Sequence, residues 1–400
     1  TRMQVQNEAA LTRQLSEASH FERYDKRSQQ WEPDDVPKRH VEIVLGTNAH
    51  KSLKTVRGLA RQPHFRSNRT LCDVPHYDSA SQIYGAFQPG EFSVPSKPTR
   101  QDAEAALAKL KHLISGFRFV AERDRAVALA GMLTGAIRSS LPTAPLFHTR
   151  ATQAGSGKTT LAKLQAAFCS PDVPQTATYS TDPIEAAKQI LALLASGPSV
   201  INYDNLTADM KDHPVMCSML TEERIQGRIL GFTKTVTCST RVLVLSSGNN
   251  VAPIGDLTRR SLVCDINPKT EHAFQIRYDF DPLEVMRENR GAFVSAALTI
   301  VLAHHAAGKP QTTCQPFGSF EAWSDMVRQP LLWLGLPDPT GCVIEADEDD
   351  PELSQLTELV HAWRECFGSV PALASTACDV AERGQFTRKE DLADVCGDRG

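Results

Sequence analysis

The chain has 400 residues, of which 41% are apolar and 22% charged, and its formal net charge is −4. This length predicts two or three domains, and the composition excludes a disordered or fibrous chain. The charge excludes a uniformly basic nucleic-acid coat, so a polyanion must bind at a local patch. No apolar run is long enough to span a bilayer, and Thr1 opens no secretory leader, so we expect no membrane contact. The natural start is expected upstream of Thr1.

Ten cysteines are scattered along the chain, and no two lie within four residues of each other. This spacing excludes a CxxC zinc or redox pair. Disulfide scaffolds are short and secreted, so we expect reduced, mostly buried thiols and a cytoplasmic protein.

The most cationic stretch runs from Lys51 to Arg69, with six basic residues and no acidic one. On a helix, Lys51, Lys54, Arg57 and Arg61 would share one side, as a solvated face or as a phosphate-contacting surface. Residues 83–98 are rich in Gly, Pro and Ser, which predicts a linker. We therefore expect a basic N-terminal domain over residues 1–95.

Helix start signals recur after this linker. Thr99 and Asp102 have capping-box spacing, and apolar positions at helical spacing follow to Ile114 and again from Val127 to Ile137. We expect a helical lead-in over residues 96–140. Asp182-Pro183 and Asp281-Pro282 each combine an N-cap acid with proline at the first helical position, so each opens a helix, the second ending at residues 308–310.

Short β-rich runs alternate with these helices, which predicts a parallel α/β sheet. They cover residues 146–149, 176–180, 199–204, 235–240 and 242–246.

The most specific motif lies between the first of these runs and a helical segment. The residues are Ala154, Gly155, Ser156, Gly157, Lys158, Thr159 and Thr160. Glycines let successive amides turn toward phosphate oxygens, the lysine reaches the β and γ phosphates, and Thr159 supplies a hydroxyl to Mg²⁺. Thr152 replaces the usual first glycine of the pattern. The motif predicts ATP and Mg²⁺ as ligands.

A phosphate loop needs a second acid on a neighbouring strand, and residues 199–204 end in Asp204. Asn205 occupies the place where a catalytic glutamate is expected. An asparagine orients a water but cannot take its proton, so hydrolysis is slow, another acid substitutes, or positioning suffices. Glu222 and Glu223 are the nearest spare carboxylates, and surface charges are the simpler interpretation of both.

The next strand ends in Asn249 and Asn250, where an amide can hold the attacking water, although paired asparagines also favour a plain turn. Arg259 and Arg260 follow ten residues later. Paired guanidiniums suit a bidentate contact with a phosphate of a neighbouring subunit, or they are an ordinary surface pair.

These elements, in this order, resemble the AAA+ branch of P-loop ATPases. Further segments are similar to the helicase half of primase-helicase proteins from phages and integrative elements, over about residues 70–367. These segments are residues 248–250, 255–260, 277–282, 298–302, 318–323 and 332–335.

The resemblance implies an ATP-driven replicative helicase of a mobile genetic element, working as a homo-hexamer with ATP sites between subunits. It implies single-stranded or forked DNA as ligand and a primase or primase-polymerase domain nearby. By this likeness Lys158, Thr159 and Asp204 bind MgATP, Asn249 is the sensor, and Arg259 or Arg260 is the finger from the next subunit. Arg277 is then a second sensor from the lid.

Residues 228–237 are expected to fold as a hairpin, either as plain core structure or as a loop lining the ring pore. In the second case Arg228 and Lys234 contact a nucleic-acid strand through its phosphates. Residues 345–352 hold six acids and predict a tether. A helical segment at 353–367 follows and begins a winged-helix-like module.

The expected fold class is thus α/β, a P-loop NTPase of the AAA+ type with helices flanking a parallel sheet. The ATPase core spans residues 141–270, a helical lid spans 271–343, and the tether and final module span 344–400. Two functions remain open: a DNA helicase or translocase, and a non-translocating AAA+ switch such as an initiator, loader or defence sensor. Stimulation of ATP hydrolysis by single-stranded DNA separates them. A protein remodeller is disfavoured because Lys234 lies beside Phe232, the only nearby aromatic residue.

Overall fold

The computed structural model describes residues 8–46, 54–153, 155–228, 235–269, 279–343, 351–368, 373 and 375–377. Its centre is a five-stranded sheet of β8 (Leu146–Ala151), β9 (Gln175–Thr176), β10 (Val200–Leu206), β13 (Leu243–Asn249) and β14 (Ser261–Ile266). The strands lie in the order β14-β8-β13-β10-β9, and every neighbouring pair is parallel. The fold is therefore α/β with an all-parallel sheet, compatible with a P-loop NTPase core.

The order of the strands differs from the expectation for Asp204. The sequence predicted its strand beside the strand that leads into the phosphate loop, but β13 lies between β8 and β10. Since all strands are parallel, their carboxyl ends still meet at one edge of the sheet. Asn249, at the end of β13, consequently lies between the ends of β8 and β10.

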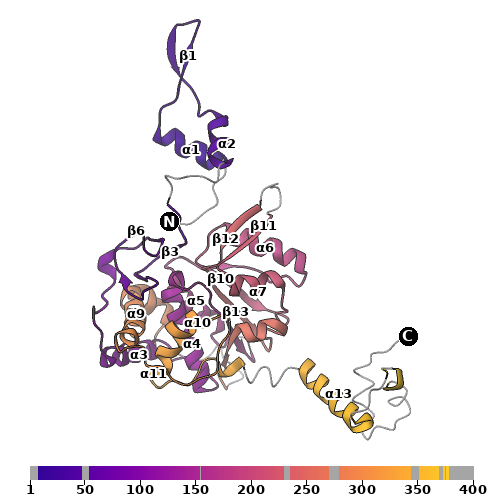
Figure 1. Ribbon diagram of the computed structural model, residues 1–400. Coiled ribbons are helices and arrows are strands. Elements are labelled where there is room, and N and C mark those ends of the chain that lie inside the picture. Colours follow the sequence, from indigo (N-terminus) through magenta and orange to yellow (C-terminus); the bar gives the residue numbers. More distant parts are fainter. Residues whose placement is uncertain are drawn as a thin grey trace.

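Helices cover both sides of the sheet (Figure 1). Helix α5 (Lys158–Cys169) packs on β8, β10 and β13, and α4 (Glu122–Ile137) packs on α5 and β14. Helices α3 (Arg100–Leu113) and α9 (Arg290–Ala306) pack against each other. The predicted capping box is confirmed, because Thr99 and Asp102 exchange hydrogen bonds at the start of α3.

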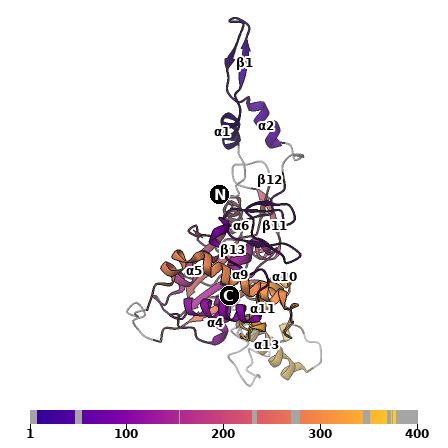
Figure 2. The same cartoon turned by 90° about the vertical axis from the view of Figure 1, so that its left-hand side faces the viewer.

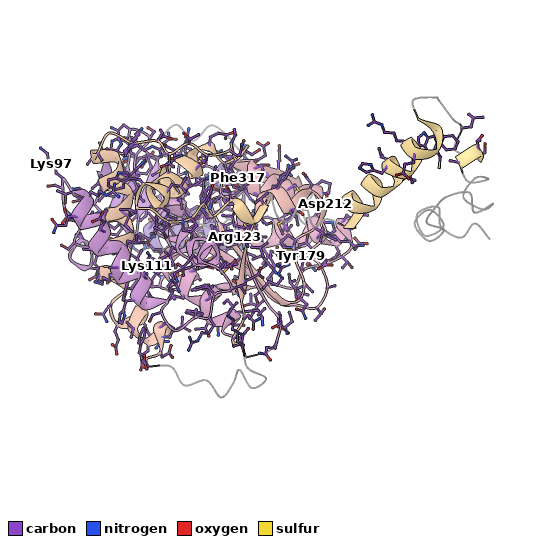
Figure 3. The ribbon with its side chains drawn as sticks, turned by 90° about the horizontal axis from the view of Figure 1, so that it is seen from below. Lys97, Lys111, Arg123, Tyr179, Asp212 and Phe317 are labelled. Atoms are coloured by element: carbon purple, nitrogen blue, oxygen red, sulfur yellow. The ribbon has the colours of Figure 1, made fainter. Side chains whose placement is uncertain are left out.

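Helices α6 (Pro183–Ala195) and α7 (Pro214–Thr221) lie on the other side of β10 and β13 in Figure 1. Asp182 accepts hydrogen bonds from the amides of residues 184 and 185, so it caps α6 as predicted. Tyr179 stacks on His213 and donates to the carbonyl of Lys211, which joins the segment after β9 to the start of α7. Figure 3 shows Tyr179 and Asp212 toward one side, with Lys97 and Lys111 toward the other.

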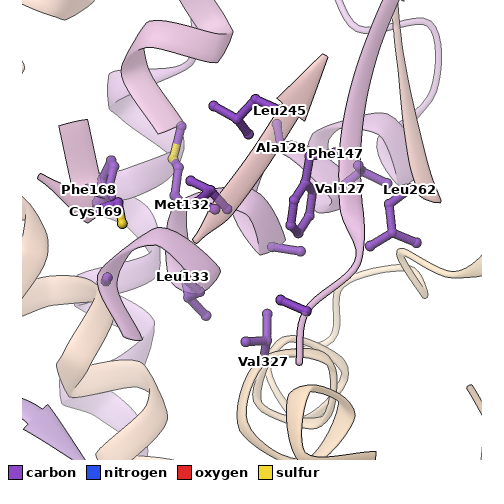
Figure 4. Close-up of a cluster of buried hydrophobic side chains, with 14 of the residues drawn as sticks. Val127, Ala128, Met132, Leu133, Phe147, Phe168, Cys169, Leu245, Leu262 and Val327 are labelled. Atoms are coloured by element: carbon purple, nitrogen blue, oxygen red, sulfur yellow. The ribbon is translucent and has the colours of Figure 1, made fainter. Parts of the chain in front are cut away.

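The core forms where α4 meets the sheet (Figure 4). Met132 and Leu133 of α4 are fully buried, as are Leu245 and Leu262 of the sheet, and Phe147 is 2% exposed. Helix α4 is buried on nearly every side, so its sequence is apolar around the whole circumference. This packing fixes the central strands and, with them, the polar residues at their ends.

Residues 58–85 form short strands rather than the expected basic helix. The strands are β3 (Gly58–Ala60), β4 (His64–Phe65), β5 (Leu71–Cys72), β6 (His76–Asp78) and β7 (Ile83–Gly85). The helix predicted through Lys54, Arg57 and Arg61 is wrong for its described part, because residues 54–57 are irregular and β3 follows. β3 pairs with β7, so the first residues of the predicted linker belong to a strand.

Other helices and strands also differ from their predicted ranges. The run at 235–240 became β12 (Thr235–Ser239), which pairs antiparallel with β11 (Arg224–Arg228) and is absent from the described parallel sheet. β9 is shorter than predicted, and β14 was not expected. The helix predicted from Pro282 breaks at Asn289 into α8 (Pro282–Glu288) and α9.

The remaining elements lie toward the two ends of the chain. Residues 8–46 form α1 (Glu8–Ala18), β1 (Glu22–Asp25), β2 (Gln30–Pro33) and α2 (Lys38–Gly46), drawn in indigo in Figures 1 and 2. After α9 come α10 (Glu321–Trp323), the π-helical turn Ser324–Arg328, α11 (Gln329–Trp333) and α13 (Pro351–Phe367). Helix α13 confirms the helical segment predicted at 353–367. The acidic tether and most of the predicted winged-helix module fall outside the described residues, and the domain boundaries stay a prediction.

Within the described ranges, no helix combines the length and apolar character that a membrane span requires. The described cysteines are all free thiols.

Candidate nucleotide-binding site

The glycine motif forms the turn between β8 and α5. Gly155 and Gly157 have φ values of +74° and +95°, which L side chains rarely adopt. A Cβ at Gly157 would also lie 3.3 Å from the Phe117 ring. The positive φ favours glycine here and the Phe117 ring leaves little room for a side chain, and Lys158 becomes the first residue of α5. Ala154 lies outside the described residues.

The Lys158 ammonium is held at the centre of this turn. It donates to Asn249 Oδ1 at 2.6 Å, to the Gln153 carbonyl at 3.1 Å and to Ser156 Oγ at 3.1 Å. Lys158 is only 8% exposed. Burial lowers the pKa of Lys158, and the negative charge of Asp204 opposes this shift. The predicted sensor and the predicted phosphate-binding lysine are therefore in direct contact.

Thr159 and Asp204 are brought together as well. Thr159 Oγ1 lies 3.1 and 3.2 Å from the two carboxylate oxygens of Asp204, and Ser247 Oγ donates to Asp204 at 2.5 Å. A hydroxyl and a carboxylate are oxygen donors of the kind that Mg²⁺ prefers. The two residues named as metal ligands from the sequence thus form a fitting donor pair.

Asn205 has a distinct backbone conformation. Its φ is +58°, and the register between β10 and β13 shifts between Tyr203 and Leu206. The backbone N–H of Asn205 donates to Ser247 Oγ at 3.3 Å. Asn205 is exposed at the same sheet edge as Asp204. Asparagine tolerates this left-handed conformation better than most residues, so the bulge and the residue type agree.

Neither spare carboxylate stands in for the missing glutamate. Glu222 and Glu223 bond through their carbonyls to Thr240, just before β13 begins, and Glu223 pairs with Arg241 at 3.4 Å. This is the amino edge of the sheet, opposite the glycine turn at residues 155–157. The interpretation of both acids as ordinary surface charges is the one that the geometry favours.

A cavity of about 840 Å³ opens beside the loop. Its wall combines residues 155–160 with residues 113–118 after α3 and residues 279–282 before α8. Phe117 and Phe280 contribute aromatic rings, and Thr160 lines the same space. This volume falls in the range of about 300–1,000 Å³ that is usual for small-molecule sites.

Arg259 and Arg260 lie away from this cavity. They end a 3₁₀ helix (Gly255–Arg260) directly before β14, which begins at the amino edge of the sheet. Both pair with Asp256, but the Arg259 side chain is 61% exposed and that of Arg260 is 13% exposed. Arg259 is therefore the guanidinium that is accessible from outside the chain.

Three other predicted site residues are not placed. Arg277 and Lys234 lie outside the described residues, as does the side chain of Arg228. The two arms of the expected hairpin are confirmed as β11 and β12, which pair antiparallel. Its predicted tip at 231–234 lies outside the described residues.

Sequence reasoning missed some residues that contact the site. Ser247 holds Asp204, and Phe117 covers Gly157. The serine pair before Gly248 carried a usable signal, because alternate residues of a strand end point to the same side. Phe117 and Phe280 carried no such signal, since they reach the site only through the packing of α3 and α8.

Comparison with protein-family models and with curated proteins gave no match. Among solved structures, the chain is similar to the NrS-1 C-terminal region, with 11% identity, TM-score 0.36, and 80% of this chain and 76% of that chain covered. It is similar to SCCmec type IV Cch, described as an active helicase, with 10% identity, TM-score 0.33, and 95% and 91% covered. It is also similar to JCV helicase, with 12% identity, TM-score 0.25, and 62% and 73% covered.

Proposed function

We propose that this chain binds ATP with Mg²⁺ and hydrolyses it to drive movement along DNA. The observation that carries the proposal is the convergence of Lys158, Thr159, Asp204 and Asn249 at the carboxyl ends of three parallel strands. An ammonium, a hydroxyl, a carboxylate and an amide in one place match the needs of a bound triphosphate. The neighbouring cavity has room for the nucleoside.

Each residue has one task in this proposal. Backbone amides of the turn and the Lys158 ammonium hold phosphate oxygens. Asn249, which accepts a hydrogen bond from the Lys158 ammonium in this structure, turns to orient the attacking water. Thr159 and Asp204 would hold Mg²⁺, which neutralises charge developing on the phosphates. Ser247 keeps the Asp204 carboxylate in place.

The proposal extends to a replicative helicase of a mobile genetic element. A homo-hexameric ring would bring Arg259 of one subunit to the nucleotide of the next, since its guanidinium is exposed and far from its own phosphate loop. The β11–β12 hairpin would present Arg228 and Lys234 to single-stranded or forked DNA. A primase or primase-polymerase domain would act alongside, and Arg277 would sense the nucleotide from the lid.

The deciding experiment measures ATP turnover with and without single-stranded DNA, together with particle mass in a non-hydrolysable ATP analogue. A translocase predicts a clear rise in turnover with DNA and a nucleotide-dependent ring mass. Turnover that DNA leaves unchanged would reject the helicase, and absence of ATP binding would reject the whole proposal.

One observation favours a second function, a non-translocating AAA+ switch. Asn205 stands exposed where a proton-accepting glutamate is expected, and an amide cannot accept the proton of the attacking water. Slow turnover would then let ATP act as an assembly signal. Asn205→Glu separates the two, because a switch should gain turnover while a translocase already adapted to asparagine should not.

A further inference from the structure

A second cavity lies at the amino edge of the sheet, opposite the nucleotide site. It measures about 200 Å³ and is enclosed by β3, the end of α4, the end of α6 and β12. Arg61, Gln62, Ser139 and Arg241 supply much of its polar wall, together with Ser199, Thr237 and Ser239, and the described lining residues include no carboxylate. A water molecule occupies about 30 Å³, so the space exceeds a single water but is smaller than usual nucleotide-sized pockets.

Four guanidiniums surround this cavity. Arg61 and Arg241 line it, with side chains 12% and 10% exposed. Arg138 and Arg290 lie behind the wall, near the lining residue Cys169. Burial raises the pKa of the Cys169 thiol, and the charges of Arg138, Arg290 and Arg61 oppose this shift. Within the described ranges Arg138 donates to backbone carbonyls, those of residues 141, 240 and 242. Arg290 donates to carbonyls and to Gln62.

Four guanidiniums surround the cavity, whereas the described carboxylates that act on them are three, Asp172, Glu223 and Glu91. Among the described residues, Arg61 pairs with Asp172 and Arg241 pairs with Glu223, and each carboxylate is 49% exposed. Arg138 and Arg290 form no ion pair within the described ranges. Burial lowers the pKa of Arg138 to about 9 and that of Arg290 to about 10, so both stay charged at neutral pH. Buried charges of one sign are unfavourable unless a counter-charge lies near.

Two donors of the lining also lack partners. Arg61 Nε and Ser139 Oγ are buried and make no hydrogen bond to the part of the chain that the structure describes. An orphaned buried donor is unfavourable, so a wall with two of them favours an acceptor in the space between. Cys169 and Cys238, which also line the cavity, are neutral because burial raises the pKa of each thiol.

We propose that this cavity binds a phosphate-class oxyanion, held by the Arg61 and Arg241 guanidiniums and by the Ser139 hydroxyl. A tetrahedral anion presents several acceptors to forked donors, which is the geometry that guanidiniums recognise. The anion is inorganic phosphate or the phosphate group of a monoester. It is distinct from the phosphates at Lys158, because that residue lies at the other end of the strands.

The experiment uses the full chain carrying Lys158→Ala, which removes phosphate binding at the glycine turn. Melting temperature and calorimetric affinity are measured with inorganic phosphate, with sulfate and with AMP, each against chloride at equal ionic strength. Arg61→Gln and Ser139→Ala are added one at a time to this background. Arg13→Gln is the matched control, because Arg13 pairs with Glu17 on an exposed helix.

We expect phosphate to bind the Lys158→Ala chain, Arg61→Gln to weaken binding about tenfold, and Ser139→Ala to weaken it several-fold. Without phosphate, Ser139→Ala should melt no lower than its parent, since it removes an unsatisfied hydroxyl. AMP binding as tightly as phosphate assigns the site to a monoester, and phosphate alone assigns it to the free ion.

Two results overturn the proposal: no phosphate binding in the Lys158→Ala chain, or equal binding in Arg61→Gln, Ser139→Ala and Arg13→Gln. Neither result depends on ATP turnover or on DNA. Failure of the proposed ATPase would leave this measurement intact.

Discussion

The two edges of one sheet hold very different polar clusters. At the carboxyl edge the polar groups bond side chain to side chain: Lys158 donates to Asn249, and Thr159 and Ser247 donate to Asp204. At the amino edge, two guanidiniums line one cavity and two more lie behind its wall, and the four bond mostly to carbonyls and to half-exposed carboxylates.

The two edges differ in whether their polar groups already have hydrogen-bond partners. The carboxyl-edge residues satisfy one another, so a ligand there must displace an existing contact such as the one between Lys158 and Asn249. The amino-edge cavity holds two unpaired donors, Arg61 Nε and Ser139 Oγ, and surplus positive charge, so an anion there gains bonds from donors that have none within the described part of the chain. Substitutions at the first edge should therefore act on turnover, and substitutions at the second should act on anion affinity and stability.

Lys158→Ala tests the first edge most strongly. Removing the ammonium should lower ATP turnover to background, a loss of about a thousandfold or more, because charge developing on the phosphates loses its main counter-charge. Phosphate release is the measurement. Lys163→Ala, an exposed lysine one turn along α5, is the control and should keep its turnover. Equal rates in both variants would contradict the phosphate cradle.

Arg259→Ala should retain ATP binding and lose turnover by about a thousandfold if its guanidinium completes the site of a facing subunit. Arg260→Ala should instead lower stability, because that side chain is largely buried on Asp256. Nucleotide affinity, turnover and melting temperature are measured for both variants. Undiminished turnover in the two would remove this pair from the catalytic machinery.

Arg138→Leu tests the second edge through stability. Three carbonyls lose their donor, so the free energy of unfolding should fall by about 3 kcal/mol in urea titrations. Arg13→Leu, an exposed arginine, should stay within about 0.5 kcal/mol of wild type. A harmless Arg138→Leu would mean that the join between β12 and β13 does not depend on the buried guanidinium.

A buried histidine in β8, between the two edges, should make the stability of the fold depend on pH. Burial lowers the pKa of His148 from 6.5 to about 4, and its ring bonds to Ser246 Oγ and the Val251 carbonyl. Because the unfolded chain takes up the proton first, stability is present above pH 6.5 and falls as the pH drops toward 4. His148→Asn should remove about 2 kcal/mol of the loss between pH 7 and pH 5. His20→Asn, at an exposed histidine, should leave the unfolding profile unchanged.

The smallest expected effect concerns the hairpin. Lys234→Ala should weaken single-strand binding a few-fold and reduce the salt slope of binding by about one, with basal ATPase intact. Binding is followed by fluorescence anisotropy over a salt series. An unaltered slope would leave Lys234 without a phosphate contact.

The sequence was sufficient to predict those features that depend only on residues close together in the chain. The turn at 155–160, the cap at Thr99 and the caps at Asp182 and Asp281 follow from local backbone chemistry, and the structure confirms the caps and the turn between strand and helix. Local patterns failed where pairing decides the outcome. The run at 235–240 has strand character in any context, and only its partner β11 makes it a hairpin arm rather than a sheet strand.

By itself, the sequence determined the phosphate-type turn, the α/β alternation and the residue types at the ends of the strands. Only the tertiary structure decided that β13 lies between β8 and β10, so that Asn249 meets Lys158. It also gathered Arg61, Arg138, Arg241 and Arg290 around one cavity from positions far apart in the chain. The physical reason is range: dihedral preferences and caps act within a few residues, whereas strand order and buried charge depend on contacts between distant segments.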